Sequence, residues 1–295
     1  MVKTSLLLYR LRCLGVEITL QGEDLSIQGM KSLLTSSMIS EIKSYKSDIL
    51  KCLKSSNPQY YPISNNQKGI WAAVKFNDSD AYHLYETRMI HGDIDPQKLR
   101  EICIQLIKDY AILRTGYDIY DSEPAQIIFN EVPIDFQYQK YTDLTTQKQK
   151  FDEIVSEPFH LYKGDVIRFR LAYVETLKQY VFMVIVHHIA SDLAGLKLIF
   201  HEISQRYTMN TVKLTKQYYQ YVIGAKSQQI KESQIKNKAI EYWKSQCNLE
   251  QLFLNFSQEH HQLKPSGRGK TYVHELSSHH TTSLIKIAKS SGVTS

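Results

Sequence analysis

The chain has 295 residues, of which 42% are hydrophobic and 22% charged, and its formal net charge is +6 at pH 7. This composition is typical of a soluble globular protein that is long enough to hold two domains. No uninterrupted apolar stretch reaches the roughly 18 residues of a membrane span, and basic residues alternate with acidic ones. We therefore expect neither a membrane nor a nucleic acid as a partner.

The four cysteines lie far apart in the sequence, and none belongs to a Cys-x-x-Cys pair. This spacing predicts neither a zinc site nor a disulfide framework. The apolar run at the N-terminus is broken at once by Arg10 and Arg12, so we do not expect a secretory signal peptide. Free thiols without a signal peptide favour a cytoplasmic protein with no bound metal.

Residues 1–54 have the pattern of a small separate unit. Three leucines share one face of a first helix, which Gly15 can end. Residues 16–20 then alternate apolar and polar side chains, and a turn at residues 22–24 leads to a second short strand. A final helix carries apolar residues at helical spacing, namely Met38, Ile42, Tyr45, Ile49 and Leu53. The predicted order is helix, hairpin, helix, followed by a polar linker with a proline at residues 54–58.

Residues 59–295 read as a second, larger domain. Asp95 and Pro96 mark the start of a helix whose apolar residues again share one face. The strand candidates are residues 84–91, 126–129, 134–138, 166–173 and 181–186. This mixture of strands and helices predicts an α+β chain whose larger domain is a layered α/β sandwich.

The most informative residues are 187–192, which read His-His-Ile-Ala-Ser-Asp. They follow a buried-strand pattern and precede a helix pattern, so two histidines lie where a strand ends and a helix begins. A histidine there can accept a proton near neutral pH. The pairs His260-His261 and His279-His280 have neither the preceding strand nor the following acid, and we interpret them as solvated residues.

The motif resembles the HHxxxD motif of condensation domains from nonribosomal peptide synthetases, which belong to the chloramphenicol-acetyltransferase-like superfamily. Other segments resemble this family in the same order along the chain. They are Ser64, Gln67 and Trp71 as the opening S-x-x-Q…W segment; Leu113-Arg114-Thr115 with Tyr117; Pro158-Phe159-His160-Leu161 with Arg168; Tyr218 and Tyr221; and Tyr242-Trp243. The ordered set is specific and covers residues 59–295.

The resemblance implies a chloramphenicol-acetyltransferase-like fold and an amide-forming acyltransferase. A carrier-bound acyl or peptidyl thioester would react with the amine of a carrier-bound aminoacyl thioester. The catalytic candidates are His188, which would take up or orient the amine proton, and His187, which would pack at the strand end. Asp192 and Arg114 would form a buried structural pair. The family binds no metal and no cofactor directly; the phosphopantetheine arms belong to its donor and acceptor carrier proteins.

The sequence departs from the family at several positions. Leu193 replaces the usual glycine after the motif acid, and Asp109-Tyr110-Ala111 stands where the family has Arg-His-Glu. The last residues, 284–295, resemble the first helix of the family's second lobe, so we expect that lobe to be largely missing. Two alternatives stay open: a non-catalytic docking or interaction fragment, and a coenzyme A-dependent acyltransferase of the same superfamily.

The front unit, residues 1–54, resembles the N-terminal docking domains of the tubulysin-synthetase type. The resemblance lies in Leu7-Leu8-Tyr9-Arg10-Leu11, Gly15-Val16, the hairpin, and the helix end at residues 46–50. It implies capture of the C-terminal tail of an upstream synthetase subunit, by addition of a strand to the hairpin edge. The alternative is an accessory unit that only packs on the larger domain.

Overall fold

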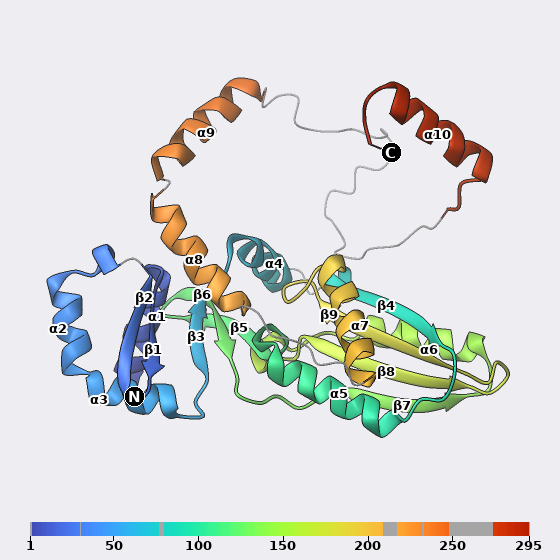
Figure 1. Ribbon diagram of the computed structural model, residues 1–295, viewed down its shortest axis with the longest axis horizontal. Helices are drawn as coiled ribbons and strands as arrows, with labels where there is room; N and C mark the ends of the chain where they lie inside the picture. Colours follow the sequence, from blue (N-terminus) through green and yellow to red (C-terminus); the bar gives the residue numbers. More distant parts are fainter. Residues whose placement is uncertain are drawn as a thin grey trace.

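The computed structural model describes residues 2–29, 31–76, 80–208, 217–231, 233–247 and 274–294. Within these residues the strands form three sheets, of two, three and four strands. Figure 1 shows the two-stranded sheet at one end of the body, the four-stranded sheet at the other, and the three-stranded sheet between them. Among the described helices, none combines the length and the apolar character needed to cross a membrane.

The N-terminal unit contains the predicted helix, hairpin and helical segment. Helix α1 (Val2–Cys13) is followed by the antiparallel strands β1 (Val16–Gln21) and β2 (Asp24–Gly29). A short 3-10 helix η1 (Lys31–Leu33) precedes helices α2 (Ser36–Ser44) and α3 (Lys46–Lys54). Their apolar faces form one core, made of Leu7, Leu8, Leu11, Val16, Ile18, Ile42, Ile49 and Cys52. Sequence periodicity therefore predicted most of this core, but it left out Leu8 and Cys52 and included Met38, which is not part of the core.

The helical segment differs from the sequence prediction in one respect, because it is two helices and not one. Tyr45 ends α2 and precedes α3, with φ −97° and ψ 12°, outside the regular helical values. The start of α2 is fixed by Thr35, whose hydroxyl accepts a hydrogen bond from the Met38 amide. The kink lets Ile42 and Ile49 enter the same core from two helices.

The four-stranded sheet has the order β4 (His83–Ile90), β9 (Gln179–His187), β8 (Ile167–Val174) and β7 (Phe136–Tyr141). The pairs β4–β9 and β9–β8 are antiparallel, whereas β7 and β8 are parallel. Helices α5 (Pro96–Asp109) and α7 (Leu193–Tyr207) cover one face, and α6 (Leu144–Val155) covers the other (Figure 1). The predicted layered sandwich is thus present.

Strand β9 is buried on both faces, which explains its uninterrupted apolar sequence. Phe182, Val184 and Val186 enter the core under α5 and α7. Their neighbours Val181, Met183 and Ile185 enter the core under α6. Because successive side chains of a strand point to opposite faces, a strand covered on both sides needs apolar residues at every position. Because β9 is packed on both faces, its C-terminal end, where His187 and His188 lie, is held in place.

The three-stranded sheet has the antiparallel order β3 (Gln59–Pro62), β6 (Glu123–Ile128) and β5 (Thr115–Tyr120). Sequence reasoning predicted only part of β6 and missed β3 and β5. Helix α4 (Asn65–Phe76) follows β3, and the 3-10 helix η3 (Ala111–Arg114) leads into β5. The remaining elements are η2 (Asp80–Tyr82), η4 (Leu161–Lys163), α8 (Tyr218–Lys231), α9 (Ser233–Gln246) and α10 (Ser278–Ser290).

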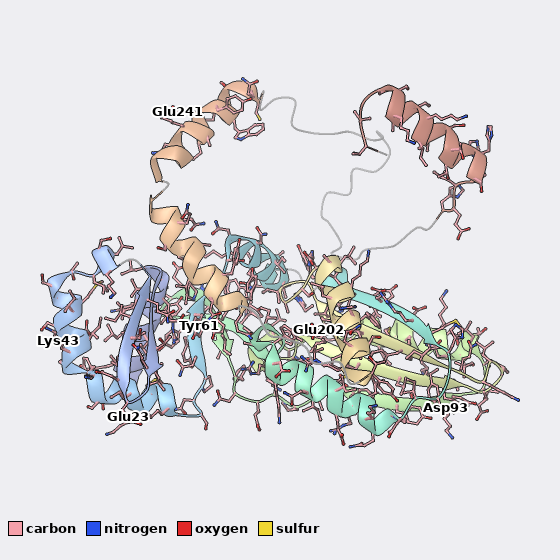
Figure 2. All side chains as sticks on the ribbon, in the orientation of Figure 1. Glu23, Lys43, Tyr61, Asp93, Glu202 and Glu241 are labelled. Atoms are coloured by element: carbon pink, nitrogen blue, oxygen red, sulfur yellow. The ribbon has the colours of Figure 1, made fainter. Side chains whose placement is uncertain are left out.

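The N-terminal unit packs directly on this middle sheet and on α8. Arg12 of α1 donates hydrogen bonds to the carbonyl of Tyr60 (2.7 Å) and to the side chain of Gln59 (3.2 Å) in β3. The Tyr120 ring stacks on Tyr60 at 3.9 Å and meets Tyr9 of α1 edge-on at 5.1 Å. The predicted linker after α3 is therefore short and leads into a strand that both units contact. Tyr61, labelled in Figure 2, marks this junction.

Candidate functional site

His187 is the last residue of β9 and is 2% exposed. It lies directly across from His83 of β4, with the two ring centres 5.9 Å apart, and the Phe159 ring lies 5.8 Å away. Burial lowers the pKa of His187 to about 3, and the neighbouring His83 and His188 add to this effect. A neutral imidazole results, and its Nδ1 accepts a hydrogen bond from the Ile189 amide at 3.1 Å. His187 therefore supports the turn after β9.

His188 is the half-buried histidine of the pair. Its backbone N–H donates to the Tyr82 carbonyl (2.7 Å), which ties the turn to the residue preceding β4. Its Nδ1 lies 2.9 Å from the Ser191 carbonyl oxygen. Because a carbonyl oxygen only accepts hydrogen bonds, Nδ1 must carry the proton, and Nε2 of the neutral ring is then a proton acceptor.

His188 lines a cavity of about 630 Å3 that lies between α4, α5 with η3, and α7. One wall is apolar and includes Leu106, Ile112 and Ile199. The polar side chains that line the cavity are Asn66, Gln67, Tyr110, His188, Ser191, Asp192, Glu202 and Tyr218. Glu202 of α7 is labelled in Figure 2. The volume of this hollow is within the range of sites that hold a small molecule or a tethered substrate.

Gln67 holds the turn that carries His188. Its Nε2 donates to the Ile189 carbonyl (3.2 Å) and to the Tyr117 hydroxyl (3.1 Å), and its Oε1 accepts from the Ser64 amide (3.0 Å). The Tyr218 hydroxyl extends this network by donating to the Ser64 hydroxyl at 3.0 Å. Four segments that each resemble the family at a different place in the sequence thus meet in one largely buried hydrogen-bonded network. Sequence order alone did not indicate this contact.

The segment Pro158-Phe159 supports the histidines from the other side. Phe159 contacts His83 and His187 edge-on. The guanidinium of Arg168 lies 3.9 Å above the Phe159 ring and donates to the carbonyls of Glu157 (2.8 Å) and Pro158 (2.6 Å). Arg168 therefore fixes the ring that packs against His187, which gives a physical reason for this pair of motif residues. His83 is a site residue that sequence reasoning missed.

The predicted buried pair of Asp192 and Arg114 does not form. Asp192 is exposed and caps α7, because its Oδ1 accepts the Gly195 amide hydrogen at 2.7 Å. Arg114 ends η3, and its Nε and Nη1 are buried without a hydrogen-bond partner. Within the described residues, no ion pair joins the two side chains. The prediction was wrong because helix capping satisfies the carboxylate locally.

Several other positions singled out in the sequence are exposed. Leu193 begins α7 and is 63% exposed, so most of the side chain that replaces the family's glycine faces solvent. Tyr221, Tyr242 and Trp243 are also exposed. His279 and His280 lie exposed at the start of α10, as expected, whereas residues 260 and 261 lie outside the described residues. No group of three or more metal-ligating side chains occurs in the described part of the chain.

The curated proteins most similar in sequence include two bacterial synthases. Bacitracin synthase 2 of Bacillus licheniformis is 28% identical over 287 residues, which cover 92% of this chain and 11% of that protein. Gramicidin S synthase 2 of Aneurinibacillus migulanus is 27% identical over 190 residues, which cover 64% of this chain and 4% of that protein. The chain therefore spans only a small part of the length of these relatives.

Solved structures share the fold. The condensation domain from the monacolin K polyketide synthase MokA superposes with a TM-score of 0.57 at 21% identity, covering 65% of this chain and 43% of that one. The EpoB cyclization-docking bidomain from Sorangium cellulosum superposes with a TM-score of 0.52 at 20% identity, covering 83% of this chain and 52% of that one. A family model described as Condensation domain matches residues 57–295. With most of its length matched in this way, the chain belongs to the condensation-domain family.

Proposed function

We propose that residues 57–295 take part in peptide-bond formation between two carrier-bound substrates of a peptide synthetase. The observation that supports this most is the fixed tautomer of His188. Its Nδ1–H is held by the Ser191 carbonyl, which makes Nε2 the proton acceptor of a ring that lines a cavity of about 630 Å3. The similarity to bacitracin synthase 2 and gramicidin S synthase 2 supports a role within a larger synthase.

In the proposed reaction, the amine of the acceptor aminoacyl thioester attacks the thioester carbonyl of the donor. A C–N bond forms and the C–S bond breaks. The proton lost by the amine passes to Nε2 of His188, and the sulfur of the donor's phosphopantetheine arm leaves as a thiol after it takes up a proton. Holding the two tethered substrates together would supply a further several kcal/mol of the rate enhancement.

The other motif residues have supporting roles in this proposal. His187 stays neutral and packs under the turn, and Asp192 fixes the start of α7 beside the cavity. Gln67 donates a hydrogen bond to the Ile189 carbonyl and thereby holds the turn that joins His188 to Asp192. His188 is the only one of the four that we expect to exchange a proton with the substrate.

The test is a His188→Gln variant in a protein that carries this chain within a complete condensation domain. We expect peptide formation from loaded donor and acceptor carrier proteins to fall by about 10²–10⁴-fold, the usual contribution of a general base. The matched control is His201→Gln, since His201 is exposed on α7. Unchanged turnover in His188→Gln, with normal thermal unfolding, would contradict the proposal.

We also propose that residues 1–54 bind the C-terminal tail of an upstream synthetase subunit. The unit has its own core and a two-stranded sheet. In the second half of the unit, Lys46 pairs with Asp24 and Lys54 with Glu23, each at 2.8 Å, so the lysines that remain there for an acidic tail are Lys31, Lys43 and Lys51, all exposed. The EpoB structure, which shares the fold of this chain, is a cyclization-docking bidomain, and this supports the proposal at the level of fold.

Titration of the chain with C-terminal peptides of synthetase subunits encoded nearby tests this second proposal. We expect dissociation constants of about 1 µM, or about −8 kcal/mol, that weaken as salt is added. Lys43→Glu combined with Lys51→Glu should weaken binding, whereas Lys148→Glu on α6 should not. Failure of every such peptide to bind would favour the alternative, in which the unit only packs on the larger domain.

A further inference from the structure

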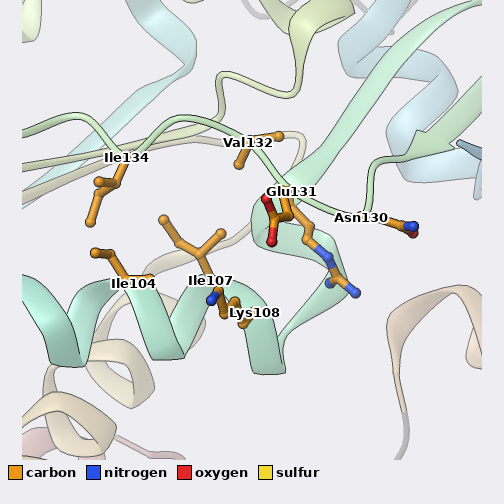
Figure 3. Close-up of a pocket in the computed structure, with 8 residues that line it drawn as sticks. Ile104, Ile107, Lys108, Asn130, Glu131, Val132 and Ile134 are labelled. Atoms are coloured by element: carbon orange, nitrogen blue, oxygen red, sulfur yellow. The ribbon is translucent and has the colours of Figure 1, made fainter. Parts of the chain in front are cut away.

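A second hollow of about 230 Å3 lies between α5 and residues 130–134. Figure 3 shows Ile104 and Ile107 of α5 below it and Val132 and Ile134 above it. Lys108 and Arg114 also line this groove. The groove is distinct from the His188 cavity, because the two share no lining residue.

Arg114 carries a positive charge that no group of the described residues neutralises at short range. Its Nε and Nη1 are buried and have no hydrogen-bond partner. The carboxylate of Asp109 is already bound by Arg206 at 2.6 Å, and the carboxylate of Asp192 caps α7. Burial lowers the pKa of Arg114, which reflects the cost of holding an unpaired charge away from water. An anion bound in the groove would offset that cost through its charge, without contact to the two buried nitrogens.

The other charges of the groove leave it positive. Lys108 and Arg114 line it together with one carboxylate, Glu131. Within the described residues, neither Lys108 nor Glu131 belongs to an ion pair. The lining therefore carries a net charge of one positive unit, beside four branched apolar side chains. A monoanion with an apolar body matches both properties.

We propose that this groove binds a small aliphatic monocarboxylate. Its carboxylate would face Arg114 and Lys108, and its hydrocarbon chain would lie among Ile104, Ile107, Val132 and Ile134. Arg114 as a whole is half-buried. At one end Lys108, which is exposed, can donate charge-assisted hydrogen bonds and Arg114 adds its charge; at the other end the four apolar side chains bury the hydrocarbon chain. The proposal does not depend on the reaction assigned to His188.

The probe is hexanoate, and hexanamide is its matched neutral control. Isoleucine methyl signals of the whole chain are followed by NMR during titration with each compound. We expect hexanoate to shift the signals of Ile104, Ile107 and Ile134, and hexanamide to bind at least about tenfold more weakly, because the charged end forms the stronger hydrogen bonds. Equal binding of both compounds, or shifts confined to Ile112 and Ile199 of the His188 cavity, would overturn the proposal.

Variants identify the groups involved. Arg114→Gln should weaken hexanoate binding by at least about tenfold. Lys108→Gln, at an exposed position that folding does not require, should weaken it several-fold, and Ile134→Trp should block the groove. Lys148→Gln on α6 is the control and should bind like the parent chain. If Arg114→Gln does not fold, the other two variants decide: unchanged affinity in both would contradict the assignment.

Discussion

The guanidinium of Arg12 lies 3.8 Å from the centre of the Tyr61 ring and joins helix α1 to strand β3. The Tyr61 hydroxyl donates to Glu17 of β1 at 3.2 Å, and Tyr219 of α8 packs on the same ring at 4.5 Å. Burial raises the pKa of Glu17, and the charge of Arg12 opposes this rise. The N-terminal unit and the larger domain thus share a buried charged cluster.

Replacement of Arg12 by leucine should strongly destabilise this junction. Arg12 is 2% exposed, and its loss would leave Glu17 buried without its cation. Removing one partner from such a cluster costs about 3–5 kcal/mol. The measurement is the free energy of unfolding from urea titration.

Arg10→Leu is the matched control on the same helix. Arg10 pairs with Asp121 at 3.0 Å, but its side chain is 60% exposed, so its loss should leave stability nearly unchanged. Similar losses in the two variants would show that the Arg12 cluster does not hold the two units together.

Local periodicity predicted the elements far better than it predicted their partners. The cores of the N-terminal unit and of β9 follow from apolar spacing, which a single sequence records. Strands β3 and β5 were missed because Tyr-Tyr-Pro and Gly-Tyr-Asp carry no clear alternation. Their identity as strands depends on pairing with β6, which is a long-range interaction.

In the site, too, local features follow from the sequence and long-range contacts do not. The position of His188 at a strand end follows from the sequence, but its tautomer depends on the Ser191 carbonyl, which only the folded turn brings close. His83 was missed because it belongs to another strand and meets His187 only through sheet register. The Asp192–Arg114 pair was predicted wrongly: an aspartate directly before a helix is itself an N-cap signal, and the family resemblance was followed in place of that local signal.

Stability should fall as the pH decreases below about 6.5, because His187 is neutral in the fold. Its pKa is lowered to about 3, so between about pH 6.5 and pH 3 the imidazole is protonated in the unfolded chain and neutral in the folded chain. The destabilisation is absent above the unfolded pKa and grows as the pH falls towards the folded pKa. Between pH 7 and pH 5 this predicts a loss of about 2 kcal/mol from His187 alone.

His187→Asn should flatten that part of the pH profile, because the asparagine carbonyl can still accept the Ile189 amide hydrogen. The exposed His201→Asn on α7 should leave the profile as it is. Urea titrations at half-unit pH steps measure both, and a parent-like slope in His187→Asn would refute the assignment.

Gln67→Leu should destabilise the turn that carries His188. The substitution removes donors to the Ile189 carbonyl and the Tyr117 hydroxyl, and it leaves buried polar atoms without those partners. We expect a loss of about 2 kcal/mol in unfolding free energy. Faster amide hydrogen exchange at residues 188–191 should accompany it. The exposed Gln105→Leu on α5 should change neither quantity, and equal exchange in both variants would show that Gln67 does not hold the turn.

Asp192→Ala and Arg114→Ala should act independently on stability. The first removes a helix cap, which costs about 1 kcal/mol. The second removes a cation that does not contact Asp192, so the double variant should equal the sum of the two within about 0.5 kcal/mol. A coupling energy above about 1 kcal/mol in urea titrations would show that the two side chains pair in solution, as the family resemblance implied.

Gly15→Ala should be much more destabilising than Gly22→Ala, although both glycines have positive φ, of 77° and 60°. A methyl group at Gly22 meets no atom within 4 Å, so only the left-handed backbone opposes it, at about 1–2 kcal/mol. At Gly15 the methyl carbon would lie 2.6 Å from the Ser227 backbone nitrogen of α8. Helix α8 would have to move, which adds about 1–3 kcal/mol.

Gly15→Ala should also speed hydrogen exchange across α8, the helix that carries Tyr218 and Tyr219, because the added methyl group displaces this helix, and Gly22→Ala should not. Equal stability and equal exchange in the two variants would show that α8 does not pack on the N-terminal unit.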